Sequence, residues 1–357
     1  MNLDTNLFNL TQPGMREFFN SMGEKPYRST QLMKWMYNQG EIDIEKMTDL
    51  SKQLREQLAL TTSFQLPEII SEKISVDGTR KWKIRVDDLN SIETVFIPEV
   101  DRGTLCVSSQ AGCALDCKFC STGKQGYNRN LSVHEIIGQV WLANKKLGYF
   151  KNQNRIITNI VMMGMGEPLL NFDNVVQAMD LMKDDLGFGL ASRRVTLSTA
   201  GIVPAIDKLT AATRVSLAIS LHAPNDELRD TLMPINRSFP IKELIDACQR
   251  YSLANNNDPI TFEYVMLSGI NDGDSEARQL ASLLRQLPAK INLIPFNPFP
   301  NSGYTCSSKK TIDKFRDTLI NAGIFTITRK TRGDDIDAAC GQLVGQIEPK
   351  ARRHQVM

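Results

Sequence analysis

From residue 105 onward, short apolar runs rich in β-branched residues alternate with segments that carry apolar residues at helical spacing. Regular alternation of this kind predicts parallel strands with helices packed outside them. Strands are expected at 105–109, 159–163, 195–198, 215–221, 260–266 and 291–294. Six such units, with one further strand near 325–329, predict an α/β fold of the incomplete TIM type, a (β/α)6 barrel.

The first hundred residues follow a different pattern. Apolar positions at helical spacing predict helices at 11–22, 29–39 and 46–59. Alternating apolar and polar positions predict strands at 70–76, 81–86 and 91–97. Asp77 and Gly78, between the first two strands, are typical of a hairpin turn. The chain is therefore predicted to consist of a helical module (1–60), a β-rich connecting segment (61–100), the partial barrel (101–300) and a C-terminal extension (301–357).

Composition excludes several classes of protein. Hydrophobic residues make up 41% of the 357 positions, which excludes a disordered chain. The 42 Lys and Arg nearly balance the 40 Asp and Glu, so any contact with nucleic acid must be local. Seven cysteines, an odd number, argue against a disulfide scaffold. Neither a secretory leader nor a run long enough to span a bilayer is recognisable, so we expect a cytoplasmic protein with reduced thiols.

Polar and sulfur-bearing residues follow nearly every predicted strand of the barrel. In barrels of this type the loops at the carboxyl ends of the strands build the active site, so these residues should meet at one mouth. In chain order they are Cys113, Cys117 and Cys120, the segment 164–168, Ser198, Ser220 with His222, and Asn297.

The cysteine loop carries the most specific signal. Three thiolates at Cys113, Cys117 and Cys120 suit a four-iron cluster with one open iron better than a structural zinc ion, which normally has four protein ligands. His134 is the residue that could complete a zinc site, although it falls in a predicted helix at 133–147. A three-cysteine loop after the first strand of such a barrel resembles the radical S-adenosylmethionine (SAM) superfamily.

Other motifs fit the same interpretation without being decisive alone. Gly166 and Glu167 lie in a glycine-rich turn that permits close backbone approach and supplies a carboxylate for a cofactor's ammonium group. Ser220 and His222 share one face of their strand because side chains alternate with a period of two. A glycine-rich strand-to-helix turn and a satisfied core histidine are the alternative explanations.

Four cysteines lie outside the predicted cluster loop. Cys248, at helical spacing, and more loosely Cys306, in a polar loop, are interpreted as structural. Cys340 lies in a charged, glycine-bearing stretch that is ill suited to a core, which is the setting expected of a reactive thiol. Cys106 lies at the end of the first strand, beside the predicted mouth.

Several longer segments resemble one particular family within this superfamily. The chain resembles the RlmN family of dual-specificity RNA adenine-C2 methyltransferases over essentially its whole length; Phe296 stands where that family leads us to expect tryptophan. The segments that carry the resemblance are 92–98, 106–110 with the cysteine loop, 166–171, 198–201, 220–224, 292–298 and the stretch around Cys340.

The resemblance implies an activity and its partners. It implies methylation at C2 of adenosine 2503 in 23S rRNA and of adenosine 37 in tRNAs, with two SAM molecules used per turnover and one [4Fe-4S] cluster as a bound cofactor. It also implies an RNA-binding N-terminal module and an external one-electron reductant such as flavodoxin, and we expect a monomer that does not associate with membranes.

The resemblance also implies residue roles. Cys340 would carry the methyl group, Cys106 would release the product by forming a transient disulfide with Cys340, and Glu93 would accept the C2 proton. The implied cluster ligands are Cys113, Cys117 and Cys120. The implied SAM-binding residues are Gly166, Glu167, Ser198, Ser220, Leu221, His222 and Asn297.

Three alternatives remain open at this point. The related enzymes that methylate adenine at C8 share the cysteine loop and the use of two further cysteines, so the motifs do not distinguish methylation at C2 from methylation at C8. The chain could instead be a non-catalytic RNA-binding protein with a zinc clip, or a radical SAM enzyme of small metabolites. The basic residues expected to hold phosphates near the mouth are Lys118, Lys124, Arg129, Lys309, Lys310, Arg329, Lys330 and Arg332.

Overall fold

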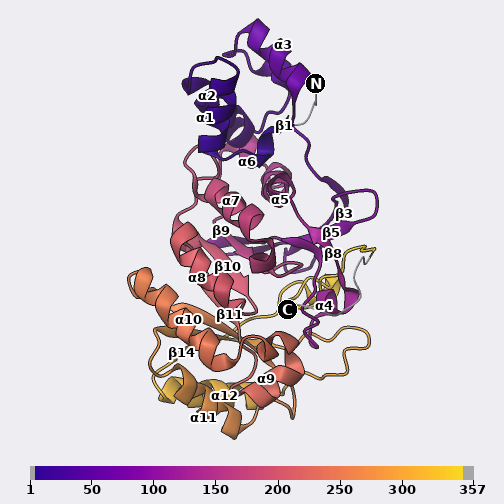
Figure 1. Cartoon of the computed structure of the whole chain (residues 1–357). Coiled ribbons are helices and arrows are strands. Elements are labelled where there is room, and N and C mark those ends of the chain that lie inside the picture. Colours follow the sequence, from indigo (N-terminus) through magenta and orange to yellow (C-terminus); the bar gives the residue numbers. More distant parts are fainter. Residues whose placement is uncertain (1–4, 349–357) are drawn as a thin grey trace.

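A ten-stranded mixed sheet organises the chain, which we describe from a computed structural model over residues 5–348 (Figure 1). The sheet runs in the order β14-β13-β12-β11-β10-β9-β6-β5-β4-β3. Its strands are β3 (Glu68–Ile74), β4 (Arg80–Arg85), β5 (Ser91–Glu99), β6 (Arg102–Cys106), β9 (Asn159–Met162), β10 (Val195–Thr199), β11 (Ser216–Ser220), β12 (Ile260–Met266), β13 (Ala289–Pro295) and β14 (Phe325–Thr328). The outer ends of the predicted parts 1–60 and 301–357 reach beyond the described residues.

The seven strands from β6 to β14 are parallel, and a helix follows each of the first six, which confirms the predicted partial barrel. Helices of this parallel part lie on the outer side of the sheet (Figure 1). They are α5 (Val133–Lys146), α7 (Phe172–Lys183), α8 (Val203–Ala212), α10 (Ile241–Ala254), α11 (Asp274–Leu284) and α12 (Lys309–Asn321). Short helices α4 (Ser121–Gln125), α6 (Tyr149–Asn152) and α9 (Asp226–Leu232) lie between these units.

Because side chains alternate along each strand, one face of the sheet is buried under the helices and the other face lines the interior of the barrel. Outward residues such as Leu105, Leu197 and Leu217 are at most 2% exposed beneath the helices. Residues one position away, such as Thr196 and Ala218, line a cavity inside the barrel instead. This is the period of two expected of strands, and it brings polar groups from separate strands into one interior space.

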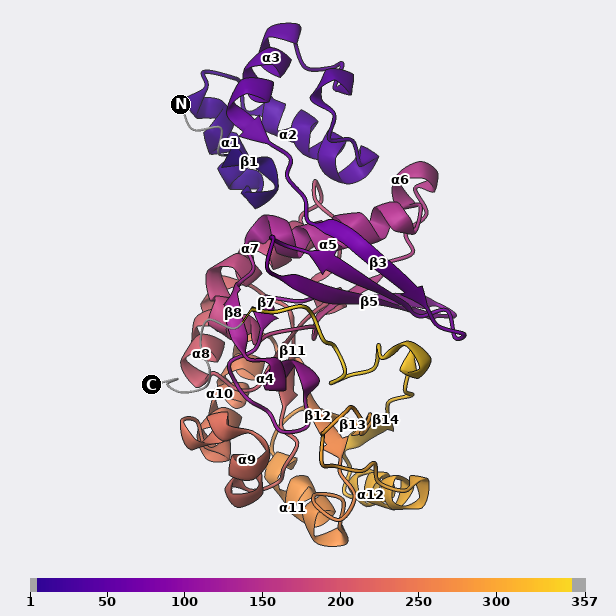
Figure 2. The same cartoon turned by 90° about the vertical axis from the view of Figure 1, so that its right-hand side faces the viewer.

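The segment predicted as a connection, 61–100, is part of the main sheet. Strands β3 to β5 are antiparallel and continue directly into the barrel, because β5 pairs with β6 through Val95 and Cys106. Ser75 to Thr79 form the predicted hairpin turn around Asp77 and Gly78. Figure 2 shows this three-stranded ribbon extending from the barrel next to the C-terminal segment.

The N-terminal module consists of α1 (Gln12–Ser21), α2 (Tyr27–Met33) and α3 (Lys52–Thr61), and its two ends are joined by pairing of β1 (Thr5–Asn6) with β2 (Thr62–Ser63). Its helices differ from the prediction in two places. The second continues into a π-helical turn, η2 (Lys34–Gln39). The predicted helix at 46–59 starts later, because the Ser51 side chain accepts a hydrogen bond from the Leu54 amide and caps α3 there.

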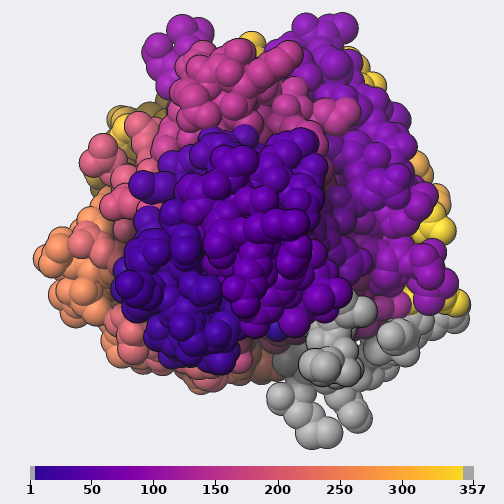
Figure 3. Space-filling model, turned by 90° about the horizontal axis from the view of Figure 1, so that it is seen from above, coloured from indigo at the N-terminus to yellow at the C-terminus, as the bar shows by residue number. Residues whose placement is uncertain are grey.

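This module packs on α5. The Trp141 indole donates a hydrogen bond to the Met36 carbonyl oxygen at 2.8 Å, and the Phe8 ring meets the Trp141 ring edge-on. Both aromatic side chains are buried. Figure 1 shows the module above α5, and Figure 3, viewed from above, shows the module as an indigo layer in front of the rest of the chain. Among the described helices, none is long and apolar enough to cross a membrane.

After β14 the chain folds back over the ribbon as a strap, residues 330–347, that carries Cys340. The Asp335 carboxylate accepts hydrogen bonds from the Ser75 hydroxyl at 2.5 Å and from the Val76 amide at 3.2 Å. These bonds lower the pKa of Asp335, so their contribution is present above the ordinary carboxylate pKa, about 4, and is lost as the pH falls below it. Asp77 also accepts a bond from the Gly333 amide. The hairpin turn thus anchors the strap.

We predict that Asp335→Ala loosens the strap without unfolding the protein. The variant loses two hydrogen bonds to the hairpin, so amide exchange around 333–343 should accelerate severalfold. Hydrogen–deuterium exchange with mass spectrometry measures this change. Asp101→Ala, at an exposed carboxylate near the next hairpin tip, is the control and should leave exchange of the strap unchanged. Unaltered exchange in Asp335→Ala would contradict the anchoring role.

Candidate active site

Nine predicted site residues line one cavity of about 170 Å³ at the carboxyl ends of the parallel strands. The cavity receives side chains from the loops after β6, β9, β10 and β11 and from the strap. The residues are Cys113, Cys117, Cys120, Gly166, Glu167, Ser198, Ser220, His222 and Cys340. We refer to this space as the cluster cavity. The expected meeting of the strand-end loops is therefore seen.

A small hairpin holds the cysteine loop. Strand β7 (Gln110–Gly112) pairs with β8 (Tyr127–Asn130), and the Cys113 amide donates to the Gly126 carbonyl oxygen at 2.8 Å. Gly112 has a φ of 83°, and a Cβ there would lie 2.0 Å from the same carbonyl oxygen, so this turn needs glycine. The sequence prediction missed this hairpin because its strands are only three and four residues long.

The three loop cysteines are partly buried, and a positive charge lies near them. Burial raises the pKa of Cys113 to about 12 and also raises the pKa values of Cys117 and Cys120. Arg229 is fully buried and acts electrostatically on Cys117. Among the described residues, no three His, Cys, Asp or Glu side chains are already gathered closely enough to hold one metal ion.

This donor set fits a sulfur-ligated cluster. Thiols must lose their protons to bind metal, and the Arg229 guanidinium favours the resulting negative charge. Burial also lowers the pKa of Arg229 to about 10, which still leaves it charged at neutral pH. Its guanidinium donates to the carbonyl oxygens of Leu221, Ala200 and Ser220, so it is held rigidly at the ends of β10 and β11.

The glycine-rich turn after β9 brings backbone and carboxylate into the cavity. Gly166 has a φ of 100°, and a Cβ there would lie 2.5 Å from the Gln110 side chain. The next residue, Glu167, is buried, and burial raises its pKa. Its two carboxylate oxygens accept bonds from the amides of Ala200 and Leu169. The carboxylate is thus fixed in place, while each oxygen keeps lone-pair capacity for a ligand.

The end of β11 presents Ser220 and His222 to the same cavity, as the alternation predicted. His222 adopts a left-handed conformation with a φ of 58°, which is uncommon for a residue other than glycine. Its Nδ1 accepts a hydrogen bond from the Val265 amide at 3.0 Å. Burial lowers the pKa of His222 to about 3, so the imidazole is neutral at physiological pH. Leu221 is buried away from the cavity and contributes backbone groups only.

A second cavity of about 530 Å³ occupies the barrel interior. We refer to it as the lumen cavity. Asn297, predicted to bind SAM, lines it, and the Asn297 amide donates to the Cys340 carbonyl oxygen at 3.1 Å. Five residues line both spaces and form the partition between them: Met163, Glu263, Ile294, Arg329 and Cys340.

Cys340 lies on the partition, whereas Cys106 lines neither cavity but is close enough to Cys340 to interact with it electrostatically. Burial raises the pKa of Cys106 to about 12, and the neighbouring Cys340 raises it further, whereas Arg329 lowers it. All seven cysteines are free thiols in this structure. The expected structural role fits Cys248, which is buried in α10, whereas Cys306 is exposed.

Glu93, the predicted base, lies beneath the strap and lines neither cavity. It is 6% exposed, and its carboxylate accepts a hydrogen bond from the Val344 amide at 2.9 Å. The Lys81 ammonium lies 3.1 Å from the same carboxylate and also donates to the Asp337 carbonyl oxygen. Glu93 therefore contacts the strap on one side and a buried lysine on the other.

Two basic residues expected to hold phosphates have other roles. Arg129 forms ion pairs with Asp87 and Glu135. Glu135 is also the capping-box residue at the start of α5. Arg329 lies on the partition. Arg129 is thus engaged in the fold and Arg329 lies inside the site, so their contact with phosphates stays a prediction.

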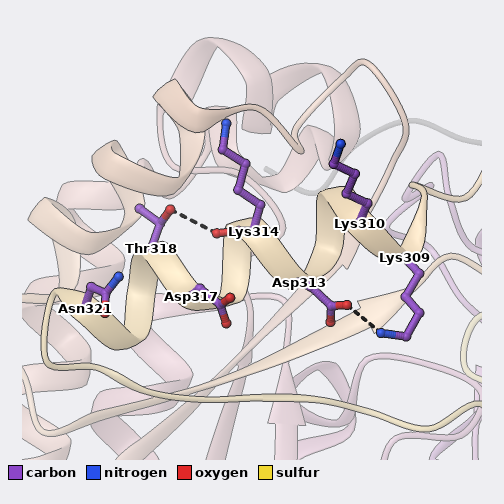
Figure 4. A pocket seen from close by; sticks show the side chains of 7 residues that line it. All are labelled: Lys309, Lys310, Asp313, Lys314, Asp317, Thr318 and Asn321. Carbon is purple, nitrogen blue, oxygen red and sulfur yellow. Dashed lines mark hydrogen bonds and ion pairs between the residues drawn. The ribbon is translucent and has the colours of Figure 1, made fainter.

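Among the remaining basic candidates, Arg332 lines the lumen cavity and forms an ion pair with Asp77, whereas Lys118 and Lys309 are more exposed. Figure 4 shows Lys309 and Lys310 on α12, where Lys309 pairs with Asp313 and Lys310 points away from that pair. Lys118 pairs with Asp116. His134 bonds to Ser132 and Asn9 and does not line the cluster cavity, so it is not placed as a fourth ligand for the three cysteines.

Comparison with known proteins agrees with this geometry. Residues 5–63 match the family described as ribosomal RNA large subunit methyltransferase N-terminal domain, and residues 107–281 match the radical SAM superfamily. The chain is 57% identical over 352 residues to dual-specificity RNA methyltransferases RlmN of Pseudomonas putida strains F1 and KT2440, covering 98% of this chain and 92% of each relative. A radical SAM methyltransferase from Sphaerobacter thermophilus superposes with a TM-score of 0.89 at 42% identity, covering 95% of this chain and 99% of that one.

The site and these relatives lead to one assignment: the chain belongs to the RlmN family of dual-specificity RNA methyltransferases, within the radical SAM superfamily.

Proposed function

We propose that the protein methylates C2 of adenosine 2503 in 23S rRNA and C2 of adenosine 37 in tRNAs through an S-methylcysteine at Cys340, consuming two SAM molecules per turnover. The observation that carries this proposal is the position of Cys340 on the wall shared by two cavities. A methyl carrier must reach a donor on one side and an acceptor on the other. Cys340 faces both spaces and neighbours Cys106.

The cofactors follow from the cluster cavity. Cys113, Cys117 and Cys120 would hold a [4Fe-4S] cluster, which supplies the electron that splits SAM and creates a carbon radical. The proposed SAM contacts are Gly166, Glu167, Ser198, Ser220, Leu221, His222 and Asn297. Fixed backbone groups and the Glu167 carboxylate support this assignment, since SAM carries an ammonium, a carboxylate and a sulfonium that need oriented partners.

Radical chemistry suits the target atom. Adenine C2 lies between two ring nitrogens and is too electron-poor to displace a methyl group from SAM directly. The Cys340 thiolate is a good nucleophile for that displacement and would take the first methyl group, releasing the demethylated cosubstrate. The carbon radical formed from the second SAM would take one hydrogen atom from this S-methyl group and leave as 5′-deoxyadenosine, which gives a carbon that can bond to C2.

Release of the product would need the second cysteine and a base. Once the radical adduct has given up its unpaired electron to the electron carrier and its C2 proton to a base, the Cys106 thiolate would attack the Cys340 sulfur to form a disulfide. The electrons of the broken carbon–sulfur bond stay with the transferred carbon, which takes up a proton to become the methyl group, and the external reductant restores the two thiols. Glu93 is proposed to accept the C2 proton. The Glu93 contacts with Lys81 and Val344 support a dependence of this step on the position of the strap. An external one-electron reductant such as flavodoxin, a cytoplasmic location and a monomeric state complete the proposal.

Methylation at C8 is the nearest alternative activity, because it would use the same thiols. Mass analysis of nucleosides from the RNA product separates 2-methyladenosine from 8-methyladenosine. A product carrying only the C8 methyl group would overturn the proposed position.

We predict that Cys340→Ala abolishes RNA methylation, by at least about a thousandfold, because no other thiol can carry the methyl group. SAM cleavage under anaerobic reduction should persist at an uncoupled rate, since the cluster ligands remain. Methylated nucleosides and 5′-deoxyadenosine are quantified from the same reaction. Cys306→Ala, which removes an exposed thiol outside the partition, should methylate RNA normally. Methylation retained in Cys340→Ala would remove this residue from the mechanism.

Cys106→Ala is expected to block a later step. Without the resolving thiol, RNA should accumulate covalently attached to Cys340, at up to about one RNA per protein in a single turnover. Denaturing gel electrophoresis and mass spectrometry of the digested adduct reveal the attachment. Free methylated RNA formed at the normal rate would show that Cys106 does not resolve the intermediate.

A further inference from the structure

The partition contains an unusual buried carboxylate. Glu263, on β12, is 3% exposed, and its Oε1 accepts a hydrogen bond from the Asn292 amide at 2.8 Å. Its Oε2 is buried and has no hydrogen-bond partner among the described residues. A buried carboxylate oxygen without a donor is unfavourable, so this atom is suited to a ligand that brings an N–H group.

A donor lies directly beside this acceptor. The Arg329 guanidinium is 3.6 Å from Glu263 Oε2, too far for a hydrogen bond but close enough for an ion pair. A quarter of the Arg329 side chain remains exposed, since it opens onto both cavities. Cys340 is the group with the largest electrostatic effect on Arg329, so the guanidinium also faces the methyl carrier.

An acceptor next to a donor matches one edge of adenine. The Watson–Crick edge of adenine offers the N6 amino group as donor and N1 as acceptor. Guanine offers O6 as acceptor and N1–H as donor, which would put donor against donor and acceptor against acceptor at the same two protein groups. Enzymes that act on flipped bases commonly recognise this edge by hydrogen bonds.

We propose that Glu263 and Arg329 recognise the target base, with Glu263 Oε2 accepting a hydrogen bond from N6 and the Arg329 guanidinium donating to N1. This inference rests on the proposed function. The base would occupy the lumen cavity, and the two residues would select adenine. Neither residue is among the predicted ligands of the cluster or SAM.

The same contacts determine which carbon is methylated. C2 is bonded to N1, so a base held by N1 at Arg329 presents C2 to the neighbouring Cys340. C8 belongs to the imidazole ring at the opposite side of the base, away from both contacts. Recognition of the Watson–Crick edge therefore gives a physical reason for C2 selectivity, which the cysteine motifs alone do not provide.

The test measures binding without chemistry. Anaerobic holoenzyme, without reductant, is titrated with a fluorescent RNA hairpin whose unpaired loop carries the target position. Adenosine is compared there with purine riboside, which lacks N6, and with 1-deazaadenosine, which lacks N1. We expect each replacement to weaken affinity roughly tenfold, the size typical of a hydrogen bond to a charged group. The matched control, 7-deazaadenosine, alters only the imidazole side and should bind like adenosine.

A variant tests whether Glu263 is the residue that contacts N6 of the base. In Glu263→Gln the ratio of the purine-riboside to the adenosine dissociation constant should fall from roughly ten towards one, because the charged acceptor is gone. Glu135→Gln breaks another buried Glu–Arg pair, outside both cavities, and should keep the wild-type ratio. Mass spectrometry of Cys340 methylation by SAM shows that each variant remains folded and loaded.

Three results would overturn the inference. The first is equal affinity of wild-type protein for adenosine and purine-riboside RNA, which needs no variant. The second is an unchanged ratio in Glu263→Gln. The third is a Glu263→Gln protein that loses SAM-dependent Cys340 methylation but keeps the ratio, which would place Glu263 at SAM. Failure of the proposed function is separate, since wild-type protein would then form no 2-methyladenosine in RNA whatever the base preference.

Discussion

The two-residue period of seven parallel strands is the constraint on which this structure depends. It sends one set of side chains under the helices, where apolar residues are buried, and the other set into a shared interior. Because the strands are parallel, their carboxyl ends lie at one edge, and every loop that follows them opens on the same space. The cluster cavity and the lumen cavity are two levels of this one arrangement.

Two arginines of this interior lie near cysteine thiols. Arg229 faces Cys117 at the level of the cluster cavity, and Arg329 faces Cys106 and Cys340 at the partition. A buried guanidinium is unfavourable unless its donors are satisfied, and Arg229 is held by carbonyl oxygens of the strand ends. Arg229 therefore brings a fixed positive charge, and Arg329 a second charge, to thiols that must become thiolates to react or to bind metal.

The sequence was sufficient for the barrel because its strands are long and strongly patterned. The strand predicted at 260–266 coincides with β12, and the loops after the strands meet as expected. The β7–β8 hairpin was missed, since three- and four-residue strands carry too few alternating positions to be recognised. Continuity of β5 with β6 depends on pairing between strands, which the pattern of a single strand does not reveal.

The same alternation could have predicted the position of two further residues of the site. Glu263 shares its strand face with Thr261 and Val265, and Arg329 follows Phe325 and Ile327 at intervals of two, so alternation alone places both in the lumen. The orphaned oxygen of Glu263 was beyond sequence reasoning, because it depends on the distances to Asn292 and Arg329. The engagement of Arg129 likewise depends on where Asp87 lies in the folded chain.

The strap and the cysteine loop are bound directly to each other. The Ser121 amide donates to the Gly341 carbonyl oxygen, Thr122 donates to Leu343, and Gln125 donates to Gly345. Ordering either segment therefore favours ordering of its neighbour, by the reciprocity that governs any two linked equilibria. A substitution that disrupts the fold of the cysteine loop should therefore also disorder the strap around Cys340, and the reverse.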